Sequence, residues 1–304
     1  RLNEKMKKLR TAVVGVGALG RHHLRWMSQL ATSDLVGCFD IDSEKAGQYA
    51  AEYHITAFQS VDELIGKVEA MSIVVPTSRH YEVASRLIKA GVHCLIEKPI
   101  TSDSAHASEL HQLAVAHNVK VTVGQIERFN PAVLALESEK IKPSFIEAHR
   151  LAAFDPRGTD VAVVLDLMIH DIDLVLKFVK SRVVDIQASA VAVISEKADI
   201  ANARLTFQSG AVANLTASRI SLHAMRKLRI FQQSGYYSLD LAAKQADLYS
   251  LADPSTPAEG MRVPLGKSGR DILYRKKGDN GQDMLAAEIA AFLDAIIHDR
   301  PVAV

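Results

Sequence analysis

The chain has 304 residues, of which 48% are hydrophobic and 23% charged, and its formal net charge is +1. This length favours two domains, and the near-neutral charge gives no reason to expect nucleic acid or an anionic membrane as a partner. No apolar run approaches the roughly 20 residues that a membrane-spanning helix needs. Cys38 and Cys94 lie inside apolar runs without metal-type spacing, so we expect buried, reduced thiols in a cytoplasmic protein.

The first part of the chain alternates between short apolar runs and amphipathic segments. We predict strands at residues 11–14, 35–39, 70–75, 92–96 and 119–123. Helices are predicted between them, around 24–30, from an N-cap at Ser43 to about Tyr53, at 79–90 before Gly91, and at 104–117. Strands that alternate with helices build parallel βαβ units. Residues 1–124 are therefore predicted to form an α/β domain with a doubly wound parallel sheet.

After Gly124 the pattern changes. We predict a short helix opened by Phe129-Asn130-Pro131, a strand at 145–152, a long helix at 161–180, strands at 183–194, 200–207, 211–219, 226–233 and 236–241, a loop at 252–270, and a closing amphipathic helix at 283–298. Short connections between successive strands favour antiparallel pairing. Residues 125–304 are therefore predicted to form an α+β domain, whose mostly antiparallel sheet has helices on one face and an open second face.

A glycine motif, Gly15-Val16-Gly17-Ala18-Leu19-Gly20, follows the first predicted strand and opens a helix. In this context the first glycine permits the turn, the second lets the backbone approach a pyrophosphate, and the third lets helix and strand pack closely. Asp40 ends the next strand, 20 positions after Gly20, where a carboxylate would bind ribose hydroxyls. No arginine follows it directly, which favours NAD over NADP. The alternative is that the three glycines serve tight turns alone.

Two further strand ends carry polar residues. Pro76 and Thr77 suit contact with the ribose and nicotinamide of a dinucleotide, whereas His80 alone is more typical of local packing at a helix start. The next strand ends in Glu97-Lys98-Pro99. Ligands of open parallel sheets bind beyond the carboxyl ends of the strands, and a partly desolvated lysine there can exchange a proton or bind a hydroxyl. A solvent-facing ion pair of Glu97 and Lys98 is the alternative.

Asp166 and His170 are four positions apart on the long predicted helix, so their side chains share one face. A carboxylate beside an imidazole fixes its tautomer and raises its basicity, as a general base for an alcohol requires. An ordinary helix-surface pair and half of a metal site are the alternatives. Because no further ligand cluster accompanies the pair, we predict no metal. The two polar residues interrupt an apolar helix, which favours a lined cavity.

Together, the motif at 15–20, Pro76-Thr77-x-x-His80, Glu97-Lys98-Pro99 and Asp166-x-x-x-His170 resemble the glucose–fructose oxidoreductase / inositol dehydrogenase (Gfo/Idh/MocA) family over essentially the whole chain. The resemblance implies a Rossmann domain, an open-faced second domain whose sheet makes the oligomer contact, and NAD(P)-dependent chemistry on a sugar or cyclitol hydroxyl. It implies that Lys98 lies beside the nicotinamide with Glu97 near the cofactor ribose. It also implies that Asp166 and His170 form the acid/base pair, in a site to which both domains contribute.

Segments 124–132, 154–160 and 166–173 are similar to the UDP-N-acetylglucosamine 3-dehydrogenase branch of that family. The branch makes a 3-keto nucleotide sugar, which an aminotransferase converts to a 3-amino sugar destined for lipid A. The similarity implies that Gln125, where histidine is more usual, contacts nicotinamide or substrate, and that Arg128 and Arg157 contact the substrate. A guanidinium suits bidentate phosphate binding, although Arg157 could equally form a loop salt bridge.

The sequence therefore predicts a cytoplasmic NAD-dependent dehydrogenase that oxidises C3 of UDP-N-acetylglucosamine and assembles as a homodimer or homotetramer. A dehydrogenase of inositol, a free sugar or another nucleotide sugar is the first alternative, and a non-catalytic dinucleotide-binding sensor is the second. Whether Lys98 or His170 is the base stays open.

Overall fold

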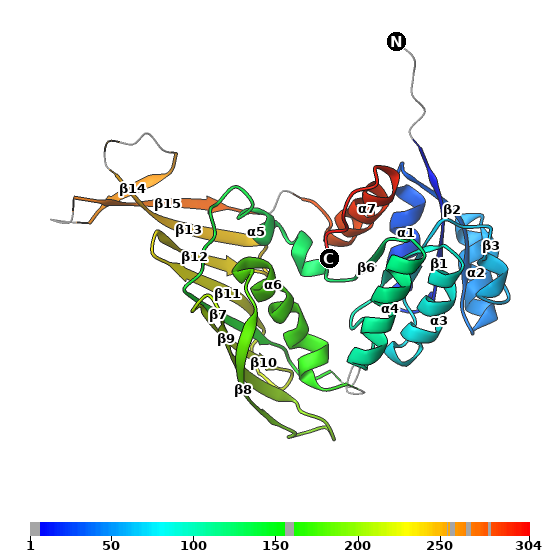
Figure 1. Cartoon of the computed structure of the whole chain (residues 1–304), viewed down its shortest axis with the longest axis horizontal. Coiled ribbons are helices and arrows are strands. Elements are labelled where there is room, and N and C mark those ends of the chain that lie inside the picture. The colour runs from blue at the N-terminus through cyan, green and yellow to red at the C-terminus, as the bar shows by residue number, and fades with distance from the viewer. Residues whose placement is uncertain (1–6, 156–160, 254, 256–258, 266–268, 279–280) are drawn as a thin grey trace, which may run out of the picture. The chain divides into compact units, whose positions relative to one another are not determined.

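The computed structural model describes residues 7–155, 161–253, 255, 259–265, 269–278 and 281–304 (Figure 1). The chain divides into two compact units, Arg1–Ile126 with Asp283–Val304, and Glu127–Gln282. Within the described ranges, no helix is long and apolar enough to cross a membrane.

A wholly parallel sheet of six strands, in the order β3-β2-β1-β4-β5-β6, forms the centre of the first unit. Its strands are β1 (Leu9–Val14), β2 (Ser33–Phe39), β3 (Thr56–Ala57), β4 (Ala70–Ile73), β5 (His93–Ile96) and β6 (Val121–Val123). The connecting elements are α1 (Gly20–Gln29), α2 (Ser43–Tyr53), η1 (Asp62–Leu64), α3 (Thr77–Lys89) and α4 (Ser104–Ala116). The strand order reverses between β1 and β4, and such a reversal is where open α/β sheets bind ligands. The predicted doubly wound parallel sheet is confirmed.

Burial on both faces explains why these strands are continuously apolar. Successive residues of β1 enter opposite clusters, since Val14 packs in the cluster that contains Leu87 of α3, and Val13 in the cluster that contains Leu24 of α1. One detail of the predicted helices was wrong. Asp42, one position before Ser43, is the N-cap of α2, and its carboxylate accepts a hydrogen bond of 3.0 Å from the Lys45 amide.

The closing helix α7 (Met284–Ile297) belongs to the first unit. Its apolar side chains, among them Ile289 and Phe292, join the cluster that Val13 and Leu24 form on one face of the parallel sheet. This differs from the predicted division at residue 124, which assigned all later residues to the second domain. The helix packs on the sheet of the first unit through long-range contacts, which no local sequence pattern predicts.

The second unit contains a sheet of nine strands in the order β14-β15-β13-β12-β11-β7-β10-β9-β8. The strands are β7 (Phe145–Leu151), β8 (Val183–Val191), β9 (Ile200–Phe207), β10 (Val212–Ser218), β11 (Met225–Gln232), β12 (Gly235–Asp240), β13 (Gln245–Ala252), β14 (Met261–Pro264) and β15 (Asp271–Lys277). All neighbours are antiparallel except β7 and β10, so the predicted mostly antiparallel sheet is confirmed. The loop prediction for 252–270 was wrong at β14, a short edge strand hidden among turn-forming residues.

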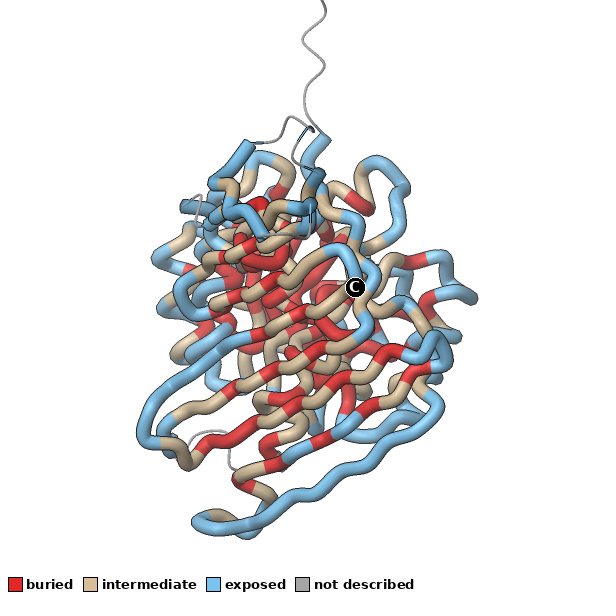
Figure 2. The backbone as a smooth tube through the Cα atoms, turned by 90° about the vertical axis from the view of Figure 1, so that its left-hand side faces the viewer, coloured by how far each residue is buried: buried red, intermediate tan, exposed pale blue. Residues whose placement is uncertain are grey.

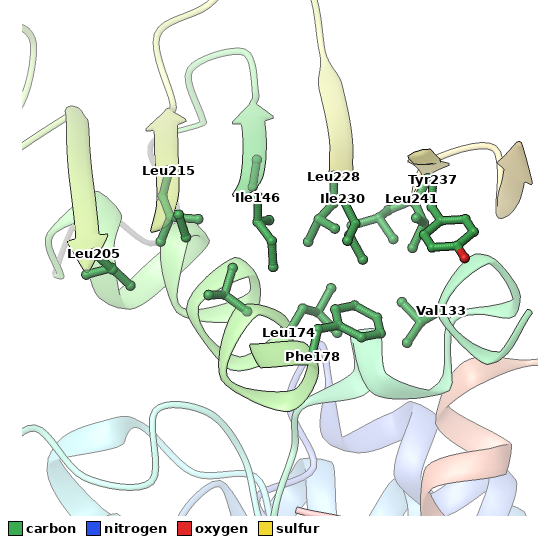
Figure 3. Packing of buried hydrophobic residues seen from close by; sticks show 14 of the residues in the cluster. Val133, Ile146, Leu174, Phe178, Leu205, Leu215, Leu228, Ile230, Tyr237 and Leu241 are labelled. Atoms are coloured by element: carbon green, nitrogen blue, oxygen red, sulfur yellow. The ribbon is translucent and has the colours of Figure 1, made fainter. Parts of the chain in front are cut away.

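Helices cover one face of this sheet. Leu174 and Phe178 of α6 (Ile169–Val179) point toward Ile146, Leu228 and other buried strand residues (Figure 3). The short elements η2 (Ile126–Phe129) and α5 (Pro131–Leu134) precede the sheet, and the π-helical turn η3 (Val164–Met168) leads directly into α6. Along the strands, buried positions alternate with partly exposed ones, which lie on the opposite, open face (Figure 2).

Candidate active site

The glycine motif connects β1 to α1, and its three glycines differ in what surrounds them. Gly15 has φ +86°, and a Cβ there would lie 2.4 Å from the Val74 carbonyl oxygen. A Cβ on Gly20 would lie 1.9 Å from the Gly15 carbonyl oxygen. A Cβ on Gly17 would meet no atom within 4 Å. The first and third glycines are thus required by packing, whereas the second leaves an open approach to its backbone.

Asp40 ties this loop to the end of β2. Its Oδ2 accepts a hydrogen bond of 2.7 Å from the Val16 amide, and its Oδ1 accepts one of 2.9 Å from the Asp42 amide. Each carboxylate oxygen retains a second acceptor position, which suits a ribose hydroxyl. Of the other motif residues, Ala18 and Leu19 are exposed where the chain enters α1, and no side chain caps that helix.

A cleft of about 580 Å³ opens beside these groups. Gly15, Gly17, Asp40 and Pro76 are among the residues that line it. Two arginines also line the cleft, and each pairs with an acid at the surface, since Arg79 Nη1 lies 2.6 Å from Glu82 and Arg86 Nη1 lies 3.3 Å from Asp62. The Asp40 carboxylate would repel the 2′-phosphate of NADP, so the cleft suits NAD better than NADP.

The residues of the first unit fit a dinucleotide. Gly17 provides the open cradle, the N-terminus of α1 provides amide donors and positive potential, and Asp40 provides ribose acceptors. Gln125 is 7% exposed, and its Oε1 has no hydrogen-bond partner among the described residues. A buried acceptor without a donor is costly, and an N–H group of a bound ligand would satisfy it.

Glu97 lies at the end of β5, and its carboxylate is held inside the unit. Oε1 lies 3.1 Å from Nε2 of His23, and Oε2 accepts a hydrogen bond of 3.1 Å from the Lys98 amide. A Cβ at Gly124 would come within 3.0 Å of this carboxylate. His23 is a functional candidate that the sequence did not reveal, because a single histidine in a helix carries no motif. The role of Glu97 beside the ribose stays a prediction.

His80 differs from the two residues predicted with it. Pro76 is exposed and lines the cleft, and Thr77 begins α3, but the His80 side chain is buried under the strand-end loops. Its Nδ1 lies 2.8 Å from the Pro99 carbonyl oxygen and its Nε2 lies 2.8 Å from the Val75 carbonyl oxygen. Its described partners are therefore two backbone carbonyl groups, one of which belongs to Val75, a residue that lines the cleft.

In the second unit, Asp166 lies in η3 and His170 lies in the first turn of α6. Both residues are half-buried, and their spacing along the continuous helix puts them on one side of it; the cavity that they would line stays a prediction. The predicted single helix is thus a π-helical turn followed by an α-helix. Single π-turns occur often at functional sites.

A buried ion network fixes this helix to β7 and η2. The Arg150 guanidinium donates to both carboxylate oxygens of Asp171, at 3.1 and 2.8 Å, and to Oε1 of Glu127 at 2.8 Å. Burial raises the pKa of Asp171, and Arg150 opposes this shift. Asn130 donates to the other oxygen of Glu127, at 2.9 Å. The turn that carries His170 is therefore anchored from two sides.

Of the two arginines predicted to bind substrate, the structure describes only Arg128. Arg128 donates to both oxygens of Asp173, through Nε at 2.7 Å and Nη2 at 2.6 Å. Its guanidinium therefore joins η2 to α6, and a substrate contact stays a prediction. Arg157 lies outside the described residues.

Comparison with known proteins agrees with this arrangement. The family described as "Oxidoreductase family, NAD-binding Rossmann fold" matches residues 9–125, and "GFO/IDH/MocA C-terminal domain" matches residues 144–238. The chain is 42% identical over 302 residues to UDP-N-acetylglucosamine 3-dehydrogenase from Acidithiobacillus ferrooxidans. The matched region covers 98% of this chain and 91% of that protein. Myo-inositol dehydrogenase Hyg17 from Streptomyces leeuwenhoekii is 30% identical over 201 residues, 62% of each chain.

Solved structures show the same fold. A structure of UDP-N-acetylglucosamine 3-dehydrogenase from Acidithiobacillus ferrooxidans matches with a TM-score of 0.87 at 41% identity, over 98% of this chain and 91% of that one. Scyllo-inositol dehydrogenase from Lactobacillus casei matches with a TM-score of 0.76 at 18% identity, over 98% and 92% of the two chains. The second match concerns the fold alone. Because both units match family models and a near full-length relative is 42% identical, the chain belongs to the GFO/IDH/MocA family of NAD-binding oxidoreductases.

Proposed function

We propose that the protein oxidises the C3 hydroxyl of UDP-N-acetylglucosamine to the 3-keto nucleotide sugar and uses NAD⁺. The observation that carries this proposal is the 42% identity to a UDP-N-acetylglucosamine 3-dehydrogenase across 98% of the chain. The match to an inositol dehydrogenase covers 62% of the chain at 30% identity, so it supports the chemistry more than the substrate.

The first unit supplies the groups that would hold the cofactor. The loop of Gly15–Gly20 and the N-terminus of α1 would bind the diphosphate, Asp40 would accept from the adenosine ribose, and Gln125 would accept from the nicotinamide carboxamide. Pro76 and Thr77 would contact the ribose and nicotinamide. When bound, NAD⁺ supplies the hydride acceptor that no side chain can provide.

His170 is the proposed base, and Asp166 orients its ring and stabilises the imidazolium that forms. As the C3–H bond breaks and its electron pair leaves as hydride, His170 takes the hydroxyl proton and a ketone remains. Lys98 donates a hydrogen bond to the same oxygen and stabilises the negative charge that develops there. If Lys98 instead takes the proton, His170 becomes the hydrogen-bond donor, and the substitutions discussed below distinguish the two assignments.

The finer parts of the proposal concern the substrate and its setting. Arg157 and Arg128 are the proposed contacts to the sugar diphosphate, because guanidinium groups bind phosphate in a bidentate manner. The 3-keto product is chemically ready for an aminotransferase, which would give the 3-amino sugar of lipid A synthesis. We propose the cytoplasm as the compartment, in keeping with the two free cysteines, Cys38 and Cys94.

We further infer that the protein is a homodimer or homotetramer built through the open sheet face. A row of five aromatic side chains crosses this face, with ring centroids 4.8–5.7 Å apart: Phe145, Phe231, Tyr236, Tyr249 and Tyr274. Each ring is half-buried by its neighbours alone. Monomeric proteins rarely leave large apolar patches exposed, which supports a partner sheet over this row.

Initial rates of NADH formation test the substrate. UDP-N-acetylglucosamine, UDP-glucose, glucose 6-phosphate and myo-inositol would be compared at equal NAD⁺ concentration. We expect kcat/KM for UDP-N-acetylglucosamine to exceed that for every other compound by about 100-fold or more, because a site that hydrogen-bonds a substrate group discriminates strongly against analogues without it. A higher kcat/KM for myo-inositol or glucose 6-phosphate would overturn the proposal.

A further inference from the structure

Two buried histidines hold the chain on either side of Lys98. His23 lies in α1 and contacts the residue before Lys98, and His80 lies in α3 and contacts the residue after it. His23 is 0% exposed and His80 is 1% exposed. The side chains of α1 and α3 pack in separate clusters, which contain Val13 and Val14 of β1 respectively, so the two helices hold the strand end from opposite faces of the parallel sheet.

The contacts of His23 form a chain of hydrogen bonds from β4 to the backbone of Lys98. An ionised carboxylate only accepts, so Nε2 of His23 carries the proton of its 3.1 Å bond to Glu97 Oε1. Ser72 Oγ lies 3.0 Å from Nδ1 and fixes the ring from the other side. Glu97 Oε2 then accepts from the Lys98 amide at 3.1 Å. The imidazole thus sets the orientation of a carboxylate that holds the Lys98 backbone.

The contacts of His80 complete the restraint. Its Nδ1 lies 2.8 Å from the carbonyl oxygen of Pro99, and its Nε2 lies 2.8 Å from the carbonyl oxygen of Val75. Carbonyl oxygens only accept, so each of these contacts is a hydrogen bond when the ring nitrogen that faces the oxygen carries the proton. Val75 follows β4 and Pro99 follows β5, so His80 joins the two strand-end loops.

We propose that His23 and His80 are positioning residues that fix Lys98 for catalysis. This inference rests on the proposed role of Lys98. A lysine side chain has four flexible carbon–carbon bonds, so the position of its ammonium group depends first on a rigid backbone. A displacement of about 1 Å in a catalytic group can cost on the order of 100-fold in rate. Two buried anchors on the adjoining residues therefore contribute to rate as well as to stability.

Amide substitutions separate the two nitrogens of each ring. A glutamine amide can replace an Nε2 donor, whereas an asparagine amide can replace an Nδ1 donor. At His23 the bond that restrains Lys98 involves Nε2, so His23→Gln should keep more activity than His23→Asn. At His80 the corresponding bond involves Nδ1, so His80→Asn should keep more activity than His80→Gln.

The experiment measures kcat, KM for UDP-N-acetylglucosamine, the dissociation constant of NAD⁺ and the melting temperature of these four variants. We expect kcat to fall by about 100-fold in His23→Asn and His80→Gln, and by about tenfold in the other two, with little change in KM or NAD⁺ affinity. His22→Asn and His111→Asn replace exposed histidines in α1 and α4, and they should behave like the unmodified protein.

The inference is wrong if the same amide, glutamine or asparagine, keeps the higher kcat at both positions. It is also wrong if the variants have lower melting temperatures but native kcat, because the two histidines then have a structural role alone. Lys98→Met distinguishes this from failure of the proposed function. If Lys98→Met turns over at a native rate, the role of Lys98 is wrong. If Lys98→Met is inactive while all four histidine variants have native kcat, the role of Lys98 stands and the positioning role is wrong.

Discussion

Asp40 combines two tasks at the residue scale. It holds the glycine loop through the Val16 amide and ends β2 in the cleft where a ribose would lie. Glu97 occupies the corresponding position at the end of β5, yet its carboxylate is engaged by His23 and by the Lys98 amide. Carboxylates at similar strand ends thus have different roles. Asp40 faces the cleft, whereas Glu97 is packed against His23 and the Lys98 amide.

Replacement of Asp40 tests cofactor selectivity. Asp40→Ser should weaken NAD⁺ binding by about 1.5–3 kcal/mol, because hydrogen bonds to a charged acceptor are lost. It should also narrow the preference over NADP⁺, since a 2′-phosphate no longer meets a carboxylate. Fluorescence titration of both cofactors measures this, and Asp34→Ser, at an exposed position on the same strand, is the control. Equal affinity of the unmodified protein for NAD⁺ and NADP⁺ would be incompatible with this role of Asp40.

Replacement of His170 and Asp166 tests the base. His170→Ala should lower kcat by about 10²- to 10⁴-fold, and Asp166→Asn somewhat less, because the base remains but is poorly oriented. The double variant should be little slower than His170→Ala, since residues that act as one unit are non-additive. Cofactor affinity should survive in all three, since both residues lie outside the unit that carries the glycine motif.

The pH profile gives an independent check on the base. An imidazole accepts a proton only when neutral, so kcat should rise with pH through one ionisation, that of the His170 imidazolium. This feature should be lost in His170→Ala. If His170→Ala keeps a near-native rate while Lys98→Met is inactive, the lysine is the base instead.

At the scale of elements, the turn that carries His170 depends on an ion network with little access to water. The side chains of Arg150 and Asp171 are each 3% exposed, and that of Glu127 is 5% exposed. Arg128 and Asp173 add a second pair, two residues further along α6 than Asp171, so η2 and α6 are joined twice. Rigid support of this kind is what a precisely placed base requires.

Removal of the central cation should be costly. Arg150→Met leaves Asp171 and Glu127 buried without a counter-charge, so the free energy of unfolding should fall by about 3–5 kcal/mol. Arg229→Met is the matched control, because Arg229 pairs with Glu147 on the open face with 40% of its side chain exposed. That change should cost about 0–1 kcal/mol. Urea unfolding of both variants measures the difference. An equal loss in the free energy of unfolding would show that the buried Arg150 pairs stabilise the fold no more than the exposed Arg229 pair.

Asp199, just before β9, should make the stability of the second unit depend on pH. Burial would raise its pKa, but hydrogen bonds from Ser195, from the Ile194 amide and from Arg219 lower it well below the usual range. A depressed pKa means that the ionised carboxylate stabilises the fold above about pH 4, and that this stabilisation is lost as the pH falls below that value.

Asp199→Asn should therefore lower the free energy of unfolding at neutral pH and flatten its decline in acid. Asp185→Asn, an exposed aspartate on β8, is the control and should retain the native pH dependence. Chemical unfolding at a series of pH values measures all three proteins. Parallel curves for the native protein and Asp199→Asn would contradict the assignment.

At the scale of the whole molecule, most strands and helices followed from hydrophobic pattern, but β3, β13, β14 and β15 were not predicted. The α/β alternation, the glycine loop and the strand ends at Asp40 and Glu97 could be predicted because each has a local signature. The partners of those residues could not. His23 meets Glu97 across 74 positions of sequence, and α7 returns to the first sheet after the whole second unit. Such contacts depend on tertiary packing, which a single sequence does not display.

Assembly can be tested through the aromatic row. Tyr249 has a ring on each side in this row, Tyr236 and Tyr274. If a second copy covers the row, Tyr249→Lys should bury a charge at the contact and produce monomers. Light scattering at micromolar concentration should give two or four times the chain mass for the native protein and a single chain for the variant. His111→Lys, on the exposed surface of α4, should keep the native mass. A monomeric native protein would contradict the inference.

Transfer of the hydrogen on C3 is the central claim, and isotopic labelling tests it most directly. UDP-N-acetylglucosamine deuterated at C3 would be incubated with the protein and NAD⁺, and the reduced cofactor analysed by mass spectrometry. The account predicts that the deuterium appears in the NADH, together with a slower rate than for the unlabelled sugar. Unlabelled NADH, formed while the deuterium stays on the sugar, would contradict it, because the hydride would then come from another carbon.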